Sequence, residues 1–250
     1  MLHAYGNGTL FGERTGDGPV RVIWLHGWGR SHRDFSTAAS LLASHGIASV
    51  ALDFPGFGAS PLPPVAGGAR YYAELLVPVL RELSDQPLIL VGHSFGGRVA
   101  AVVAAMQQVG LAGVVFTGAP LVKRQGGRRS PLRYRVVRSL HRLGMVPSSV
   151  MESARQRYGS ADYRQASGLL RDILVATVNE SYEAELSRIS LPTTIIWGAE
   201  DTDVPVESAE RAANLLPTRP PIQVLPACGH LVPTSKPEAL VDAVLGMVRS

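Results

Sequence analysis

The 250-residue sequence predicts an α/β fold: a mostly parallel central sheet with helices on both faces and an inserted helical segment. Three observations carry this prediction. Short apolar runs alternate with segments of helical period over residues 20–117 and again over 193–248. The runs are apolar along nearly their whole length, which is typical of parallel strands buried on both faces. Between these two regions, only helical periods recur.

Each element has its own signal, taken in chain order. The run Val-Arg-Val-Ile-Trp-Leu follows a Gly/Pro turn and predicts the first strand, and similar runs predict the later ones. Apolar residues spaced three and four apart predict the helices. The expected strands are 20–25, 47–52, 88–91, 111–117, 193–197 and 222–225, and the expected helices are 35–42, 72–83, 98–108, 208–216 and 237–248.

The alternation breaks at about residue 121. No strand pattern occurs over 122–187, whereas helical periods do, and a compact domain rarely holds so long a loop without structure. We therefore expect a core of residues 1–121 and 188–250, with a helical cap inserted at 122–187.

The sequence Gly-His-Ser-Phe-Gly places Ser94 directly after one predicted strand and before a helix. A G-x-S-x-G match alone is weak, but a strand-to-helix turn this tight presents its central residue at the carboxyl end of the sheet. A serine needs a base to take its proton and an acid to orient that base. Ser94 is therefore the candidate nucleophile.

The base and the acid are expected after later strands. His230 lies five residues beyond the strand 222–225, and we take it as the base. Three carboxylates, Glu200, Asp201 and Asp203, follow the strand 193–197, and position alone does not separate them. The backbone N–H groups of Trp28, in a glycine-flanked loop, and of Phe95 are the expected oxyanion donors.

These motifs resemble those of the α/β-hydrolase fold superfamily. His-Gly-Trp-Gly at 26–29, the Asp53 loop, the Ser94 turn, the 197–205 loop and Cys-Gly-His230 match its signposts in order and spacing. The resemblance implies Asp201 as the acid, a structural role for Asp53, and a helical cap at the insertion. It is nearest to small serine carboxylesterases, including the pimeloyl-carrier-protein methyl ester type, and a serine at position 94 sets the chain apart from relatives with an aspartate nucleophile.

The function we expect is cofactor-free hydrolysis of small-molecule carboxylic esters through an acyl-enzyme on Ser94. A carbon–carbon bond hydrolase or a thioesterase would use the same three groups. A perhydrolase and a ligand receptor on a hydrolase scaffold also stay open. Cys228 is the single cysteine, which excludes an internal disulfide and a cysteine-only metal cluster. With no leader pattern and no apolar run of ~20 residues, we expect a cytoplasmic protein without a metal or stable membrane insertion.

The net charge of +4 is unevenly spread, because residues 122–145 hold eight basic residues and no acidic one. Helical spacing within this segment predicts a helix that buries its apolar positions Leu132, Val136 and Leu140. Its cationic face would carry Arg133, Arg135 and Arg138. That face is either a solvated surface or a guide for an anionic partner, namely a charged ester, an acidic carrier protein or an anionic membrane surface. The scarcity of interleaved aromatic residues argues against nucleic acid.

Overall fold

The structure is a computed structural model that describes residues 1–123, 132–158 and 161–249. Within these ranges, the side chains of residues 132, 133, 135, 155, 156, 158 and 161 are not described. No helix in the described ranges is both long and apolar enough to cross a membrane.

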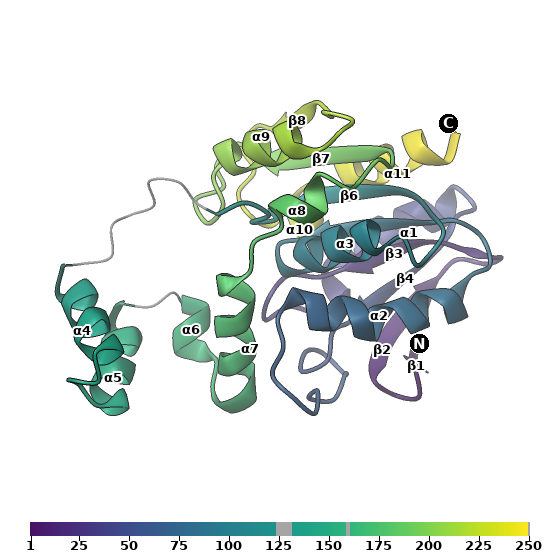
Figure 1. Ribbon diagram of the computed structural model, residues 1–250. Coiled ribbons are helices and arrows are strands. Elements are labelled where there is room, and N and C mark those ends of the chain that lie inside the picture. Colours follow the sequence, from purple (N-terminus) through teal and green to yellow (C-terminus); the bar gives the residue numbers. More distant parts are fainter. Residues whose placement is uncertain (124–131, 159–160, 250) are drawn as a thin grey trace.

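An eight-stranded sheet in the order β1-β2-β4-β3-β5-β6-β7-β8 forms the centre of the molecule (Figure 1). Strands β3 to β8 run parallel to one another, while β2 pairs antiparallel with both β1 and β4. The strands are β1 Leu2–Tyr5, β2 Leu10–Thr15, β3 Val20–Leu25, β4 Ala48–Asp53, β5 Leu88–His93, β6 Leu111–Thr117, β7 Thr193–Gly198 and β8 Ile222–Leu225. The mostly parallel sheet is therefore confirmed.

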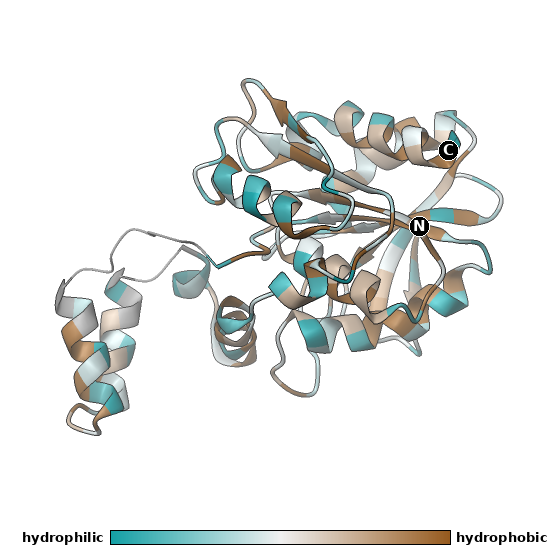
Figure 2. Cartoon of the chain, turned by 45° about the horizontal axis from the view of Figure 1, so that its top comes forward, coloured by the Kyte–Doolittle hydropathy of each residue, from teal (hydrophilic) through white to brown (hydrophobic). Residues whose placement is uncertain are grey.

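The helices divide between the two faces of this sheet. They are η1 His32–Phe35, α1 Ser36–Ser44, α2 Ala69–Leu83, α3 Phe95–Met106, α4 Leu132–Arg142, α5 Ser148–Tyr158, α6 Ala161–Gln165, α7 Gly168–Asn179, α8 Glu183–Leu186, α9 Val206–Leu215, α10 Val232–Ser235 and α11 Pro237–Arg249. In β3, Val22 and Trp24 pack toward α1 and α11, whereas Ile23 and Leu25 pack toward α2 and α3. This alternation buries both faces, as the apolar strands predicted, and Figure 2 shows apolar residues concentrated on the strands.

Two strands were not predicted. All of β1 except Tyr5 is exposed, and in β2 the buried Leu10 and Gly12 alternate with the half-buried Phe11 and Glu13. Neither has the continuous apolar run that marks the central strands. They form an antiparallel hairpin at the sheet edge, where one side of a strand faces water.

Helices α4 to α8 all lie between β6 and β7, and α4 packs against α5 as a hairpin that stands apart from the sheet (Figure 1). The expectation that α4 buries its apolar positions is wrong for Val136, which is 49% exposed. Leu140 is half-buried, and the side chain of Leu132 lies outside the described residues. The reason is that, among the described residues, α5 is the main neighbour of α4, so most of the outer face of α4 is left uncovered. The domain bounds 122–187 remain our proposal.

Asp53 ends β4 and has no exposed surface. Its carboxylate accepts hydrogen bonds from the backbone N–H of His32 at 2.6 Å and of Ala59 at 2.8 Å, and it lies 2.9 Å from the imidazole Nδ1 of His32. These contacts tie the loop after β3 to the loop after β4. The loop after β3 lines the candidate site, and Phe57 of the loop after β4 packs on Trp28 with the ring centroids 4.9 Å apart. Asp53 therefore fixes the relative position of these two loops without touching Ser94.

Replacing Asp53 by Ala should reduce the free energy of unfolding by about 3 kcal/mol, because the buried N–H of His32 and the partly buried N–H of Ala59 lose their acceptor and the His32 imidazole loses its partner. Asp53→Asn keeps one acceptor oxygen and should cost less. Urea unfolding of both variants measures this difference. A loss below about 0.5 kcal/mol for the alanine variant would contradict the role of Asp53 in joining the loops.

Candidate active site

Ser94 lies in a strained turn between β5 and α3. Its φ is 50° and its ψ is −109°, a region that L-residues rarely adopt and that costs about 1–3 kcal/mol. The backbone N–H of Ser94 donates to the carbonyl of Thr117 at 2.9 Å, which anchors the turn to β6. A Cβ on Gly92 would come within 2.6 Å of the Gly97 Cα, and one on Gly96 would overlap the Leu25 carbonyl. The turn therefore closes only with glycine at both flanking positions.

His230 and Asp201 are joined by a direct hydrogen bond. The Nδ1 of His230 lies 2.8 Å from Oδ2 of Asp201, whose side chain is 1% exposed. The other oxygen, Oδ1, accepts the backbone N–H groups of Asp203 at 3.0 Å and Val204 at 2.8 Å. With both oxygens engaged, the carboxylate is held still, and its contact leaves the Nε2 of His230 available for proton transfer.

The three carboxylates that position alone left equivalent, and among which the resemblance implied Asp201, differ in their contacts. The side chains of Glu200 and Asp203 are exposed, and neither forms a hydrogen bond with His230 among the described residues. Asp201 alone reaches the imidazole. Ser94 and His230 line the same cavity, although no hydrogen bond joins them among the described contacts; such bonds commonly tighten only when substrate binds.

The two expected oxyanion donors also border this cavity. Trp28 and Phe95 both line it, and their rings are 5.7 Å apart in an edge-to-face contact. Phe95 is the first residue of α3, where a backbone N–H has no partner within the helix. In the described part of the chain, neither backbone N–H donates to another protein group. Both are available to an incoming oxygen.

Two buried histidines support these groups and were not singled out as functional from the sequence. The Nε2 of His26 accepts the N–H of Phe54 at 3.0 Å, so its Nδ1 carries the proton and donates to the Gly27 carbonyl at 2.7 Å. This holds the loop that carries Trp28. The His93 ring lies 4.8 Å from the His230 ring, and its Nδ1 lies 3.2 Å from the Thr117 carbonyl. The only feature of the sequence that could have indicated a role for these two histidines is their position at strand ends, beside Gly27 and Ser94.

The cavity around Ser94, here the Ser94 cavity, has a volume of about 510 Å³. Its charged lining includes Asp162 and Asp203 together with Arg30 and Arg98. Arg30 is neutralised by a bidentate contact with Asp34 at 2.6 and 2.8 Å. Burial raises the pKa of Asp162, and the charge of Asp203 adds to that shift. Burial lowers the pKa of Arg98, whose guanidinium donates to the Thr177 carbonyl at 3.0 Å.

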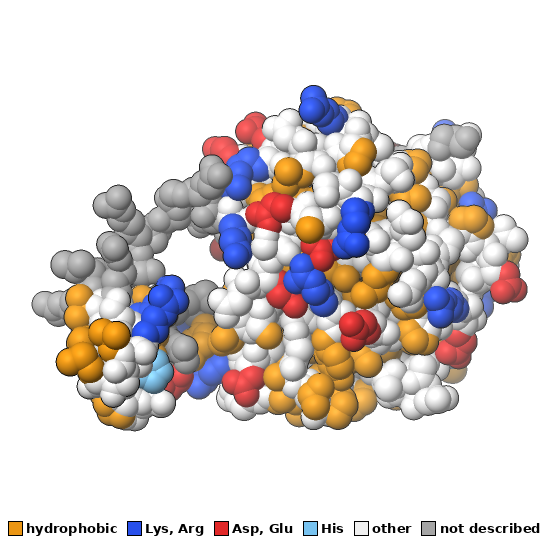
Figure 3. Space-filling model, in the orientation of Figure 1, with side chains coloured by type: hydrophobic (Ala, Val, Ile, Leu, Met, Phe, Trp, Pro, Cys, Tyr) orange, Lys and Arg blue, Asp and Glu red, His pale blue; other side chains and the backbone are white. Residues whose placement is uncertain are grey.

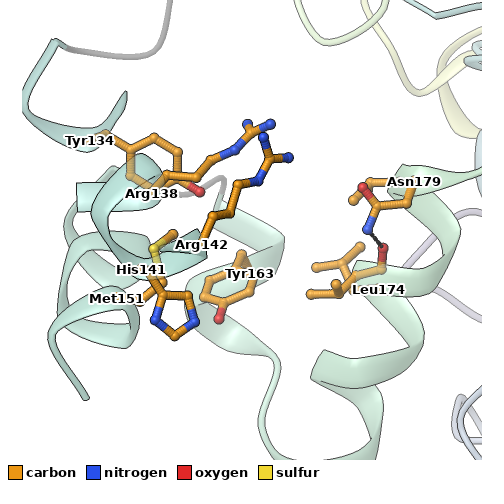
Figure 4. Close-up of a pocket in the computed structure, with 10 residues that line it drawn as sticks. Tyr134, Arg138, His141, Arg142, Met151, Tyr163, Leu174 and Asn179 are labelled. Atoms are coloured by element: carbon orange, nitrogen blue, oxygen red, sulfur yellow. Dashed lines mark hydrogen bonds between the residues drawn. The ribbon is translucent and has the colours of Figure 1, made fainter. Parts of the chain in front are cut away.

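Of the three arginines expected to guide a partner, only Arg138 can be placed. The side chains of Arg133 and Arg135 lie outside the described residues. Arg138 is exposed and lines a second cavity between α4 and α7, together with Arg142 (Figure 4).

Asp201, Asp203 and His230 are the one grouping of three metal-ligating side chains in the described ranges, with ligand atoms within 4.8 Å of one another. The hydrogen bonds of Asp201 to His230 and to two backbone N–H groups already occupy the carboxylate. The grouping fits an oriented histidine better than a cation site.

Residues 22–243 match the sequence profile of the alpha/beta hydrolase family. Among curated proteins, the chain is 31% identical to the lipase LipV of Mycobacterium tuberculosis over 91% of this chain and 92% of that protein. It is 27% identical to a 2-hydroxy-6-oxononadienedioate/2-hydroxy-6-oxononatrienedioate hydrolase of Cupriavidus pinatubonensis, over 86% of this chain and 82% of the relative.

Among solved structures, the esterase EaEST of Exiguobacterium antarcticum superposes with a TM-score of 0.75 at 20% identity, covering 100% of this chain and 99% of that one. At that identity, the likeness shows the shared fold alone.

A buried histidine beside His230 makes stability depend on pH. Burial, reinforced by His230, lowers the pKa of His93 to about 3. Below about pH 6.5 the unfolded chain therefore binds a proton that the native state does not, and stability falls by about 1.4 kcal/mol per pH unit. His93→Asn should remove that part of the slope, measured by urea unfolding between about pH 7 and pH 5. His26, whose pKa burial also lowers, accounts for a residual slope. An unchanged slope in the variant would contradict a neutral, buried His93.

Proposed function

The chain belongs to the alpha/beta hydrolase family, and we propose that it is a cofactor-free serine hydrolase that cleaves carboxylic esters. The observation that carries this proposal is the 2.8 Å contact between His230 and the buried Asp201, in a cavity that Ser94 also lines. A cytoplasmic location and a helical cap at 122–187 belong to the same proposal.

In the proposed reaction, the Oγ of Ser94 attacks the ester carbonyl while the Nε2 of His230 takes the hydroxyl proton. The N–H groups of Trp28 and Phe95 stabilise the negative oxygen of the tetrahedral intermediate. When this intermediate collapses, the ester C–O bond breaks and His230 gives its proton to the leaving alcohol. Water then attacks the acyl-enzyme with His230 again as base, releasing the acid and restoring Ser94. Asp201 stabilises the imidazolium at each transfer.

Ester hydrolysis is favoured by the similarity to the lipase LipV, a relative at 31% identity. The 27% identity to a hydrolase of an oxo-dienedioate makes carbon–carbon bond cleavage the second candidate, since the same three groups would serve it. A panel of p-nitrophenyl esters, thioesters and a 2-hydroxy-6-oxo-dienoate separates these activities. A protein that turns over none of them would point to a ligand receptor on the hydrolase scaffold.

Replacing Ser94 by Ala should lower kcat for p-nitrophenyl esters by roughly 10³ or more, because the acyl-enzyme no longer forms. Only the contribution of the oxyanion donors and of binding should remain. Steady-state kinetics on the folded variant measure this change. Turnover at the native rate would mean that another nucleophile is used.

Replacing Asp201 by Asn should lower kcat by roughly 10³- to 10⁴-fold, because the amide fails to stabilise the imidazolium and favours the wrong tautomer. Glu200→Gln is the matched control: it removes the same charge from the neighbouring exposed position and should leave kcat within a few fold. If both variants lose activity equally, Asp201 has no special role in orienting His230.

A further inference from the structure

The second cavity has a volume of about 420 Å³ and lies between α4 and α7 (Figure 4). We call it the α4–α7 cavity. Its charged lining consists of two arginines, Arg138 and Arg142, and His141 also lines it; all three come from α4. The opposite wall is largely apolar, with Leu174, Val175 and Val178 of α7. A site with cations on one wall and aliphatic side chains on the other suits an amphiphilic anion.

Arg138 and Arg142 are one helical turn apart, and Figure 4 shows both guanidinium groups extending from α4 into the gap that faces Leu174 and Asn179. Neither forms an ion pair with a described residue. Glu152, on the adjacent α5, is already taken, because its carboxylate contacts Arg171 at 2.7 Å and Tyr163 at 2.7 Å. The residues that the structure leaves undescribed add no Asp or Glu side chain to the segment. Two neighbouring guanidinium groups without a protein carboxylate are suited to bind one from a ligand.

The α4–α7 cavity adjoins the Ser94 cavity, because Leu174 and Val178 line both. These two side chains are also one turn apart, so they form a continuous apolar surface along α7. The charges differ between the two ends: the Ser94 cavity is lined by two acidic and two basic side chains, whereas the charged side chains that line the α4–α7 cavity are arginines alone. An anionic group is therefore favoured at the α4 end and an uncharged ester at the Ser94 end.

We propose that the α4–α7 cavity binds a carboxylate at the far end of the substrate's acyl chain, so that the preferred substrates are half-esters of dicarboxylic acids. This rests on the proposed ester hydrolysis at Ser94. The apolar part of the acyl chain lies along Leu174 and Val178, and the terminal carboxylate pairs with Arg138 and Arg142. Arg98, in the Ser94 cavity, is the other cation that could bind the terminal carboxylate. Its guanidinium, however, already donates a hydrogen bond to the Thr177 carbonyl and lies over the Tyr182 ring, 5.9 Å from its centroid.

The test compares two methyl esters of equal length, one with a terminal carboxylate and one with a terminal carboxamide, over a series of chain lengths. At the best length and low salt, kcat/KM for the carboxylate should exceed that for the carboxamide by roughly tenfold. The preference should shrink as salt is added. Arg138→Gln/Arg142→Gln should reduce the preference to about twofold or less, by lowering kcat/KM for the carboxylate much more than for the carboxamide.

Arg33→Gln/Arg249→Gln removes the same charge from exposed positions on the core and should keep the full preference. Equal kcat/KM of the native protein for the two esters would overturn the proposal. So would a preference for the carboxylate that survives in the Arg138→Gln/Arg142→Gln variant. A preference lost only in Arg98→Gln would also overturn it, by placing the carboxylate in the Ser94 cavity.

The failure of the proposed function would look different, because then neither ester would be cleaved. Calorimetric titration with suberate needs no turnover and decides the binding claim separately. Suberate should bind the native protein and the Arg33/Arg249 variant and bind the Arg138/Arg142 variant at least about tenfold more weakly. Equal binding of suberate to all three proteins would rule out a carboxylate site at Arg138 and Arg142, even if the protein hydrolyses esters.

Discussion

The turn at Ser94 is the constraint on which the rest of the site depends. A positive φ at a serine is unfavourable, and it is held here by the hydrogen bond to Thr117 and by the buried packing of β5 and α3. Because α3 starts within one residue of the strand, the same turn presents the Ser94 hydroxyl and the unpaired N–H of Phe95 to one cavity. Glycine is required at positions 92 and 96 because a side chain at either position would collide with backbone atoms.

Around this turn, two buried, neutral histidines hold neighbouring loops and strands in place. His26 ties the Trp28 loop to Phe54, and His93 lies between Thr117 and the ring of His230. Burial lowers the pKa of both, which keeps them neutral near the candidate base and avoids a competing positive charge beside the imidazolium that forms there. The exposed arginines of α4 lie away from these neutral histidines. The molecule thus separates a polar but nearly neutral reaction centre from a cationic region across α7.

Much of this arrangement follows from the sequence, and the exceptions have physical causes. Apolar runs predicted the six parallel strands within two residues at each end, because all of these strands except the half-exposed edge strand β8 are largely buried on both faces. The β1–β2 hairpin was missed because an exposed edge strand carries no such run. Position alone left Glu200, Asp201 and Asp203 equivalent, and only the family resemblance implied Asp201. In the structure, the 198–204 turn buries Asp201 against His230. Helix α4 shows the reverse: its amphipathic pattern is clear, yet Val136 is exposed because no partner covers it.

The central claim is that Ser94 is a nucleophile activated by His230. Labelling with a fluorophosphonate, followed by intact-mass and peptide mass spectrometry, tests it without any assumption about substrate. We expect rapid, stoichiometric modification of the peptide that contains Ser94, and much slower labelling when His230 is replaced by Ala, since the hydroxyl then lacks its base. Modification at a different residue, or labelling of Ser94 at the same rate without His230, would contradict it.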